Sequence, residues 1–414
     1  MRYGMPYKGS KNSIAAEIIS ILPPAKHFYD IFGGGGAMTH AAALSGKYQY
    51  IHYNELNPLI CKGFNCVISG RIPDPRQWVT RADFAKLKNE DPMIAICWSF
   101  NTNLREYSYA VERAPLKKAW HYLYQYHTDA LLREMEITGA PLTGEEEIRR
   151  WARDHADEIK EKYITWYKAV HYADPQFDTV GAFTAAECRY KQICERLRAY
   201  LRDGLKRSGL TQADIDRLTG TYMSGHYFGS CQWEFPTKEA YRFLQELMPL
   251  DLSWESTGGQ CLTAMREMQR INALKDLEDL KPFEFARAPD VLARIERIKG
   301  IDLSGHSITV TNGDYRDLEF EDDAVIYADP PYRGTDQYGT EFDSDAFITW
   351  AEEQKPPVYV SEADYIDRWD IVWSKQKQEL MCVGGHKKRT EILYKVVKNE
   401  GFREGFRVLG RGQG

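Results

Sequence analysis

The sequence predicts an α/β fold in which a parallel sheet is interrupted by a large, mostly helical insertion domain. Two short apolar segments, 27–32 and 48–53, have the length and composition of strands, and each runs into a turn and then a helix. Residues 76–300 are mostly helical in pattern, and strand-like segments return only near the end of the chain. A single sheet built from both ends of the chain accounts for this order.

The elements near the N-terminus follow from local signals. Residues 13–22 predict a helix, because their apolar side chains recur on one face and two prolines follow. The strand 27–32 runs straight into four consecutive glycines, and a helix of small residues comes after them. The strand 48–53 ends at Asn54-Glu55, and Pro58 suits the first turn of the next helix.

The remaining elements are assigned in the same way. Helical patterns in the insertion are clearest at 145–172, 185–207, 237–247 and 289–299. Strand patterns resume at 308–311, 324–328 and 358–361, and a hairpin is expected from 378–383 and 391–397, joined by the polar residues 384–390. We therefore divide the chain into a first part of the sheet domain at 1–75, the insertion at 76–300 and a second part of the sheet domain at 301–414.

The composition excludes several classes of protein. Of the 414 residues, 43% are hydrophobic and 28% are charged, the balance of an ordinary globular chain. No apolar run is long enough to cross a membrane and the first residues lack the apolar core of a signal peptide, so we expect a cytoplasmic protein. The eight cysteines form no Cys-x-x-Cys pair, which argues against a zinc site. A net charge of −6 argues against indiscriminate coating of nucleic acid but leaves room for a local basic face.

A glycine turn, Asp30–Gly36, follows the first strand and is the first candidate for ligand binding. Glycines let the backbone turn tightly and let a ligand lie close to it. A turn without a ligand is one alternative. A dinucleotide site is another, but Thr39 stands where that motif, counted from Gly34, requires a third glycine. Glu55, at the end of the next strand, could accept both hydroxyl hydrogens of a ribose, although alone it could equally be a solvated glutamate.

The decisive motif is Asp329-Pro330-Pro331-Tyr332, directly after the predicted strand 324–328. The prolines stiffen the turn and remove backbone donors. The Asp329 carboxylate and the Pro330 carbonyl can then both accept hydrogens from a single amino group, and the Tyr332 ring offers a flat face for a base. The alternative is a rigid turn without chemistry.

In its motifs and their order the chain resembles the Dam-like (D12 class) family of adenine-specific DNA N6-methyltransferases. Residues 6–11 resemble the short N-terminal cofactor motif, and the glycine turn, a target-recognition insertion and Asp-Pro-Pro-Tyr follow in the family's order. Residues 357–361 and 388–394 resemble the next strand and the terminal hairpin. The resemblance covers about 1–70 and 305–400, and the insertion is longer than in compact members of the family. It implies a Rossmann-like class I methyltransferase sheet that uses S-adenosylmethionine.

Carried over position by position, the resemblance implies roles for named residues. Those expected to bind the cofactor are Tyr7, Lys11, Asp30, Phe32, Gly34, Gly36, Glu55, Asp314 and Asp329. Among them, Gly34 and Gly36 would cradle the methionine end and Glu55 would take the ribose hydroxyls. Asp314 would pair with the cofactor's adenine amine. Asp329, Pro330 and Tyr332 would be catalytic, acting on an adenine flipped out of the duplex without a metal.

Contacts to double-stranded DNA are expected from three places. The segment 99–107 contains Asn101, Asn103 and Arg105, whose amide and guanidinium groups suit major-groove edges; an ordinary polar turn is the alternative. Tyr338, or Phe342 in the same loop, could close over the flipped base. Lys388 and Arg389 could hold phosphates, although such clusters are often solvated surface. The insertion would carry target recognition, or else serve oligomerisation or stability.

Two other functions fit the same motifs. A methyltransferase of this fold could act on RNA or on a protein amide, since an amide presents similar hydrogens to the site. A non-catalytic DNA-binding protein could have kept the fold, but the intact Asp329–Tyr332 motif argues against lost chemistry. A restriction endonuclease partner or a phage–host context is left open, as is the oligomeric state.

Overall fold

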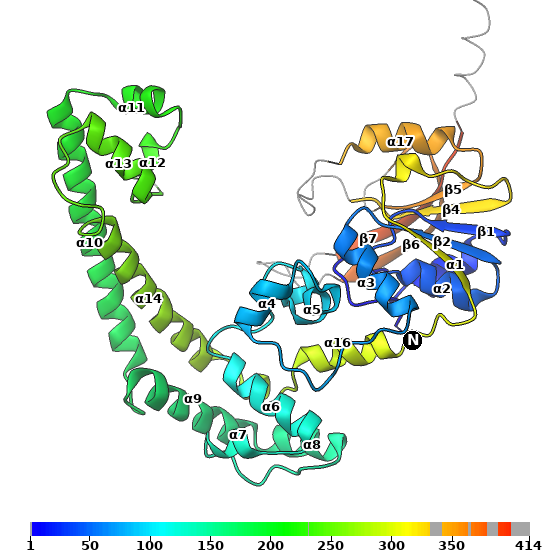
Figure 1. Cartoon of the computed structure of the whole chain (residues 1–414), viewed down its shortest axis with the longest axis horizontal. Coiled ribbons are helices and arrows are strands. Elements are labelled where there is room, and N and C mark those ends of the chain that lie inside the picture. Colours follow the sequence, from blue (N-terminus) through cyan, green and yellow to red (C-terminus); the bar gives the residue numbers. More distant parts are fainter. Residues whose placement is uncertain (1, 231, 332–341, 363–365, 379–387, 399–414) are drawn as a thin grey trace, which may run out of the picture. The chain divides into compact units, whose positions relative to one another are not determined.

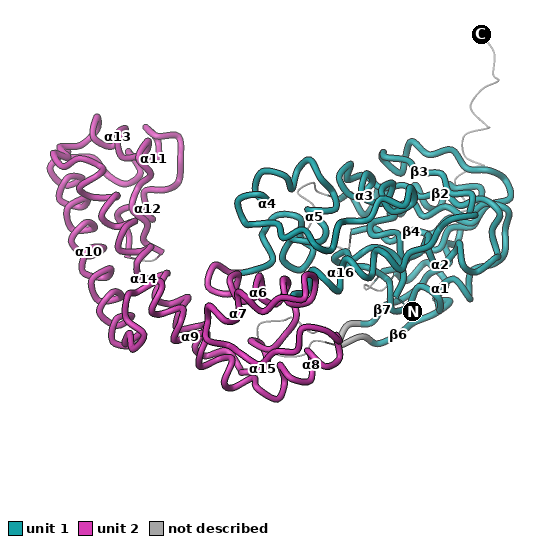
Figure 2. The backbone as a smooth tube through the Cα atoms, turned by 60° about the horizontal axis from the view of Figure 1, so that its bottom comes forward, with its two compact units in different colours: residues 1–109, 289–414 teal, residues 110–288 magenta. Residues whose placement is uncertain are grey.

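The chain folds into two compact units. The computed structural model describes residues 2–230, 232–331, 342–362, 366–378 and 388–398. Unit 1 consists of residues 1–109 and 289–414, and unit 2 consists of residues 110–288 (Figure 2). Both ends of the chain therefore contribute to unit 1.

Unit 1 contains a seven-stranded mixed sheet with the order β3-β2-β1-β4-β5-β7-β6. Its strands are β1 (His27–Asp30), β2 (Tyr50–Asn54), β3 (Ser307–Thr311), β4 (Ala324–Ala328), β5 (Val358–Glu362), β6 (Asp370–Gln378) and β7 (Lys388–Lys395). Strands β1 to β5 are parallel, and β7 runs antiparallel to both of its neighbours. The predicted α/β class is confirmed, and the sheet is consistent with a methyltransferase fold.

Helices cover both faces of the sheet. Helices α1 (Ala15–Ile21) and α2 (Ala37–Ser45) lie on one face and α17 (Ser344–Glu353) on the other (Figure 1). The strands β4 and β5 are buried along their whole length, which explains their nearly continuous apolar sequences. Phe347, Ile348 and Ala351 of α17 pack in one core with residues of β1, β4 and β5.

The other helical elements of unit 1 come from segments that flank unit 2 in the chain. They are α3 (Pro58–Ile68), α4 (Arg81–Leu87), α5 (Pro92–Trp98), η1 (Phe100–Thr102), α16 (Asp290–Lys299) and η2 (Tyr315–Asp317). Helix α5 packs against both α3 and α16. Residues 76–109 and 289–300, which the sequence pattern assigned to the insertion, pack in unit 1. The boundaries of the recognition insertion at residues 76 and 300 stay a prediction.

Two predicted elements differ from the observed ones. The strand that pairs with β7 begins at Asp370 rather than at 378, because β6 is a polar edge strand whose alternation is easily taken for a loop; residues 379–383 lie outside the described chain. The single helix expected at 145–172 is two helices that meet at His155. The predicted antiparallel pairing with the terminal strand is confirmed.

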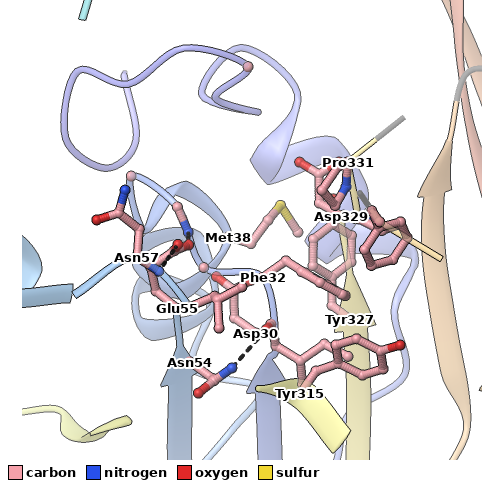
Figure 3. A pocket seen from close by; sticks show the side chains of 18 of the residues that line it. Asp30, Phe32, Met38, Asn54, Glu55, Asn57, Tyr315, Tyr327, Asp329 and Pro331 are labelled. Carbon is pink, nitrogen blue, oxygen red and sulfur yellow. Dashed lines mark hydrogen bonds between the residues drawn. The ribbon is translucent and has the colours of Figure 1, made fainter. Parts of the chain in front are cut away.

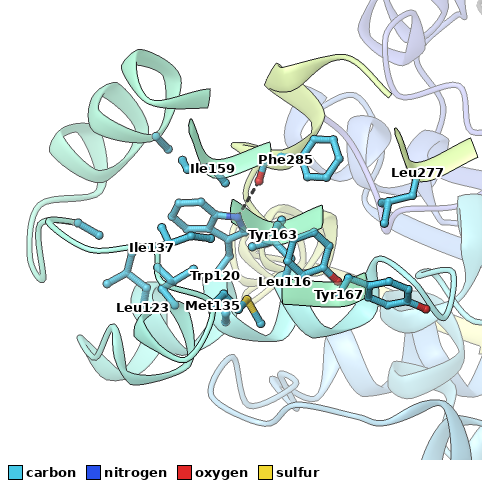
Figure 4. Close-up of a cluster of buried hydrophobic side chains, with 14 of the residues drawn as sticks. Leu116, Trp120, Leu123, Met135, Ile137, Ile159, Tyr163, Tyr167, Leu277 and Phe285 are labelled. Carbon is cyan, nitrogen blue, oxygen red and sulfur yellow. Dashed lines mark hydrogen bonds between the residues drawn. The ribbon is translucent and has the colours of Figure 1, made fainter. Parts of the chain in front are cut away.

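Unit 2 consists of helices joined by turns and loops, with no strand among its described residues. Its helices are α6 (Ala114–Tyr126), α7 (Ala130–Arg133), α8 (Glu145–Asp154), α9 (Ala156–Tyr172), α10 (Thr179–Ser208), α11 (Gln212–Thr219), α12 (Ser224–Phe228), α13 (Lys238–Leu247), α14 (Gly258–Asp279) and α15 (Pro282–Phe285). Helix α10 packs along α14. One apolar cluster centres on Trp120 (Figure 4), and a second joins α10 to α11, α12 and α13. No helix in the described ranges is long and apolar enough to cross a membrane.

The Trp120 cluster should dominate the stability of unit 2. Trp120 is fully buried and its indole N–H donates to the Phe285 carbonyl at 2.8 Å. Trp120→Ala should therefore lower the free energy of unfolding by about 3–5 kcal/mol, and Trp120→Phe by less. Tyr222→Ala is the matched control, because 93% of that aromatic side chain is exposed. Denaturant unfolding followed by circular dichroism measures both, and equal effects at the two positions would contradict this packing.

Candidate active site

The sheet topology marks where a ligand should bind. Within the sheet, β2 and β3 lie on one side of β1, and β4 and β5 lie on its other side. Ligands of open α/β sheets bind at such a switch point, beyond the carboxyl ends of the strands. A cavity of about 680 Å³ lies there (Figure 3). Its walls come from the N-terminal residues 7–11, the glycine turn and the ends of β2, β3 and β4.

A buried lysine connects three segments at the bottom of this site. The Lys11 ammonium lies 2.7 Å from an Asp329 oxygen and 3.0 Å from a Glu391 oxygen, and only 4% of its side chain is exposed. Burial alone would lower the pKa of Lys11, but the charges of Asp329, Tyr327 and Glu391 outweigh it and raise that pKa above its usual value. The Ser361 hydroxyl donates to the same Glu391 oxygen at 3.0 Å. A charged lysine thus ties Asp329, directly after β4, to Glu391 in β7.

Asp30 anchors the glycine turn. One of its oxygens accepts hydrogen bonds from the Thr39 backbone N–H at 3.1 Å and the Thr39 hydroxyl at 2.7 Å. Burial raises the pKa of Asp30 to about 7, against the lowering effect of these bonds, and the charges of Asp329 and Glu55 act in the same direction as burial. Thr39, which departs from the dinucleotide motif, therefore joins the end of β1 to the start of α2.

The glycines of the turn are required first by the protein's own packing. Gly34 and Gly36 have left-handed backbones, with φ of +49° and +70°. A Cβ on Gly36 would lie 2.2 Å from the Phe64 ring, and one on Gly33 would lie 2.2 Å from the Tyr53 ring. Gly33, Gly34 and Gly35 line the cavity, whereas Gly36 does not. The structure thus brings Gly34, but not Gly36, to the site.

Glu55 is oriented at the cavity by two backbone donors. Its oxygens accept the Gly34 N–H at 2.9 Å and the Asn57 N–H at 2.8 Å. Burial raises the pKa of Glu55 and these two bonds lower it, with burial prevailing. Nearby, the Asn54 amide donates to the carbonyls of Ile31 and Gly313, while its buried oxygen has no hydrogen-bond partner within the described chain. An orphaned acceptor in the cavity wall fits a ligand that brings a donor.

Other residues expected at the cofactor or at the target base also reach the cavity. Tyr7, Phe32, Asp314 and Pro330 line it, and so does Phe342. The carboxylate of Asp314 pairs with the Arg316 guanidinium at 2.6 Å, and this contact lowers the pKa of Asp314. Tyr332 and Tyr338 lie outside the described residues, and Lys388 and Arg389 begin β7 with side chains that are also outside them.

The segment 99–107 is a compact loop closed by a bridge between Ser99 and Tyr107, and it does not line the cavity. The side-chain oxygen of Asn103 accepts the backbone N–H groups of Arg105 and Glu106 at 2.9 and 3.0 Å. Asn103 therefore shapes the loop itself. The side chains of Asn101 and Arg105 are exposed, as base or phosphate contacts would require.

Sequence reasoning missed the parts played by Glu391, Ser361 and Asn54. No role was predicted for Glu391, which belongs to the hairpin motif 388–394. A glutamate followed by three apolar strand residues is nevertheless a sign of a buried charge with a partner. Asn54 directly precedes Glu55 at the end of β2, and a polar residue at that edge of a parallel sheet is itself a binding-site signal.

Residues 7–128 match the family described as D12 class N6 adenine-specific DNA methyltransferase. This match confirms the family resemblance over the segment from Tyr7 to the first helix of unit 2, including the glycine turn, Glu55 and the 99–107 loop. Members of that family are enzymes that methylate adenine in DNA. No curated protein matches the chain.

The raised pKa of Asp30 predicts a pH dependence of stability. The folded chain binds this proton more tightly than the unfolded chain, with a pKa of about 7 against an ordinary 3.8. Stability should therefore fall as the pH rises from about 4 to about 7. Asp30→Asn mimics the neutral acid and should flatten this fall in thermal unfolding, whereas Asp322→Asn on the exposed surface should not. A fall of unchanged size in Asp30→Asn would show that this carboxyl does not titrate in that range.

Proposed function

We propose that this protein transfers a methyl group from S-adenosylmethionine to the N6 amine of adenine in double-stranded DNA. The observation that carries the proposal is the position of Asp329. Its carboxylate is fixed by the buried Lys11 ammonium, next to Pro330 in the wall of the switch-point cavity. The family match at residues 7–128 supplies independent support from a different part of the chain.

Several groups in the cavity wall would suit parts of that cofactor. Glu55 would accept the ribose hydroxyls, and the orphaned Asn54 oxygen would accept a further donor. The turn at Gly34 lets the amino-acid end approach the backbone, and Tyr7 and Phe32 provide aromatic walls. Carboxylates predominate over the single buried ammonium of Lys11, which favours a ligand with a positive charge. When bound, S-adenosylmethionine supplies the electrophilic methyl group.

Asp329 and Pro330 would activate the target amine. The nitrogen lone pair of adenine is delocalised into the ring, so the free amine is a poor nucleophile. The Asp329 carboxylate and the Pro330 carbonyl would each accept one amine hydrogen and favour a pyramidal nitrogen with its lone pair directed outward. The methylated nitrogen then loses one proton, and the Asp329 carboxylate is the acceptor nearest to it. Positioning and electrostatics account for this catalysis.

The target base must leave the duplex to reach a site below the surface. We assign the stacking face to Tyr332 and the closing role to Tyr338 or Phe342. Sequence reading would fall to the exposed side chains of the 99–107 loop and to the insertion, while Lys388 and Arg389 would hold phosphates. A site-specific enzyme of this kind would suit a restriction–modification system or a phage, and its place would be the cytoplasm.

An enzyme of the same fold that acts on RNA or on a protein amide is the second candidate, because either substrate presents two amine hydrogens to Asp329. Incubation with tritiated S-adenosylmethionine and DNA, RNA or protein separates the three. We expect label in DNA alone, recovered as N6-methyladenine. Label in RNA or protein but not in DNA would overturn the assignment.

Asp329→Asn should reduce methyl transfer at least about a hundredfold, because the amide lacks the charge and can present a donor to the amine. The measurement is single-turnover transfer to DNA at saturating cofactor. Asp322→Asn is the control, since Asp322 is an exposed aspartate paired with Lys355. Turnover of Asp329→Asn near that of the control would remove Asp329 from the active site.

Glu55→Gln should weaken cofactor binding about tenfold, because the loss of one charged acceptor toward a hydroxyl has about that effect. Calorimetric titration without DNA gives the dissociation constant, and Glu319→Gln on the surface serves as the control. An unchanged dissociation constant in Glu55→Gln would place the ribose elsewhere.

A further inference from the structure

Helix α16 carries two arginines, one turn apart, that hold the two segments on which ligand binding depends. One face of the helix is buried through Val291, Ile295 and Ile298. Beside that face, Arg294 and Arg297 donate hydrogen bonds to backbone carbonyls of segments distant in sequence. An arginine in an amphipathic helix is usually a solvated surface residue, whereas these two guanidinium groups bind backbone carbonyls of other segments.

Arg294 holds both ends of the 99–107 loop. One of its terminal nitrogens donates to the Cys97 and Ser99 carbonyls, at 2.7 Å each, and lies 2.9 Å from the Ser108 hydroxyl. Nearby, the backbone N–H of Val291 donates to the Tyr109 hydroxyl at 3.3 Å. The loop is therefore fixed on α16 at the residues that precede and follow it.

The loop needs such a support because its backbone is strained. Asn101, Thr102 and Leu104 have left-handed conformations, with φ of 48°, 53° and 63°. A left-handed conformation is unfavourable for a residue other than glycine and persists only where the surroundings impose it. Within the loop, the Ser99 hydroxyl accepts the Leu104 N–H at 3.1 Å, so a shift of Ser99 would be passed to the strained residues.

Arg297 holds the N-terminal residues that lead to Tyr7 and Lys11. Its guanidinium donates to the Gly4 carbonyl at 2.9 Å and the Tyr3 carbonyl at 2.7 Å. On the other side of this strap, residues 3–11, the Gly4 N–H donates to His40 at 3.1 Å and the Met5 N–H donates to the Gly35 carbonyl at 2.7 Å. The strap is thus held between α16 and the glycine turn.

We propose that α16 positions the two ligand-binding segments separately. Arg294 is a specificity-determining positioning residue that sets the shape of the base-reading loop, and Arg297 is a positioning residue that places Tyr7 and Lys11 at the cofactor. The proposal rests on the proposed function. Neither arginine touches the reacting groups; each acts through the backbone it holds.

The test compares Arg294→Ala, Arg294→Lys, Arg297→Ala and Arg297→Lys in the full-length chain. Two quantities are measured for each: the dissociation constant for S-adenosylmethionine without DNA, and the ratio of kcat/KM on the preferred DNA site to that on sites changed at one base. Circular dichroism and thermal unfolding establish that each variant is folded.

We expect a crossed result. Arg294→Ala should lower the site-preference ratio about tenfold and leave the cofactor dissociation constant within about twofold of the wild-type value. Arg297→Ala should raise the cofactor dissociation constant about tenfold and leave the site-preference ratio within about twofold. Each lysine variant should restore part of the loss, because a lysine can still donate to one carbonyl. If an alanine variant does not fold, the lysine variants decide by the same comparison.

Parallel changes in both quantities at both positions, or no change at either, would overturn the proposal. These outcomes are distinct from failure of the proposed function, which would show as absence of DNA methylation by the wild-type chain. In that case the cofactor titrations of the Arg297 variants still decide whether α16 positions the strap.

Discussion

The shared ion pair of Lys11 is the constraint on which the site depends. A lysine that is almost completely buried requires compensating charge, and here it has two carboxylates at 2.7 and 3.0 Å. These carboxylates belong to Asp329 after β4 and Glu391 in β7, so one ammonium joins three parts of the chain. Removal of Lys11 would leave the carboxylates of Asp329 and Glu391 without their shared cation, which would be strongly destabilising, whereas removal of one carboxylate leaves the lysine paired with the other. Asp329 therefore has a defined position only when the N-terminal segment that carries Lys11 and the C-terminal strand β7 are folded together.

The two segments of unit 1 are held together although unit 2, residues 110–288, separates them in the sequence. The strands that precede unit 2 and those that follow it pair directly in the sheet, with β1 between β2 and β4. The strap, the glycine turn and the end of β4 then meet at one switch point, while the chain leaves and re-enters unit 1 beside α16. All residues that line the cavity belong to unit 1.

Strands β1 to β5 could be predicted from the sequence, and eight of the nine residues expected at the cofactor line the cavity, because apolar strands, glycine turns and strand-end acids are local signals. It did not locate β6, whose polar residues lie on an exposed edge, or the break at His155 between α8 and α9. The parts of Glu391, Arg294 and Arg297 depend on partners hundreds of residues away, and nothing in their neighbours along the chain specifies those partners. Gly36 shows the opposite case, since a glycine expected to face a ligand instead makes room for Phe64.

We propose that Asp329, held by Lys11, accepts a hydrogen of the adenine amine that receives the methyl group from S-adenosylmethionine. Single-molecule sequencing of DNA from cells that produce either the wild-type chain or Asp329→Ala reports the modified base and its sequence context together. We expect N6-methyladenine within one short sequence word in the presence of the wild-type chain, and its complete absence with the variant present at the same level. Unmodified adenine with the folded wild-type chain, or the same modified word with the variant, would contradict it.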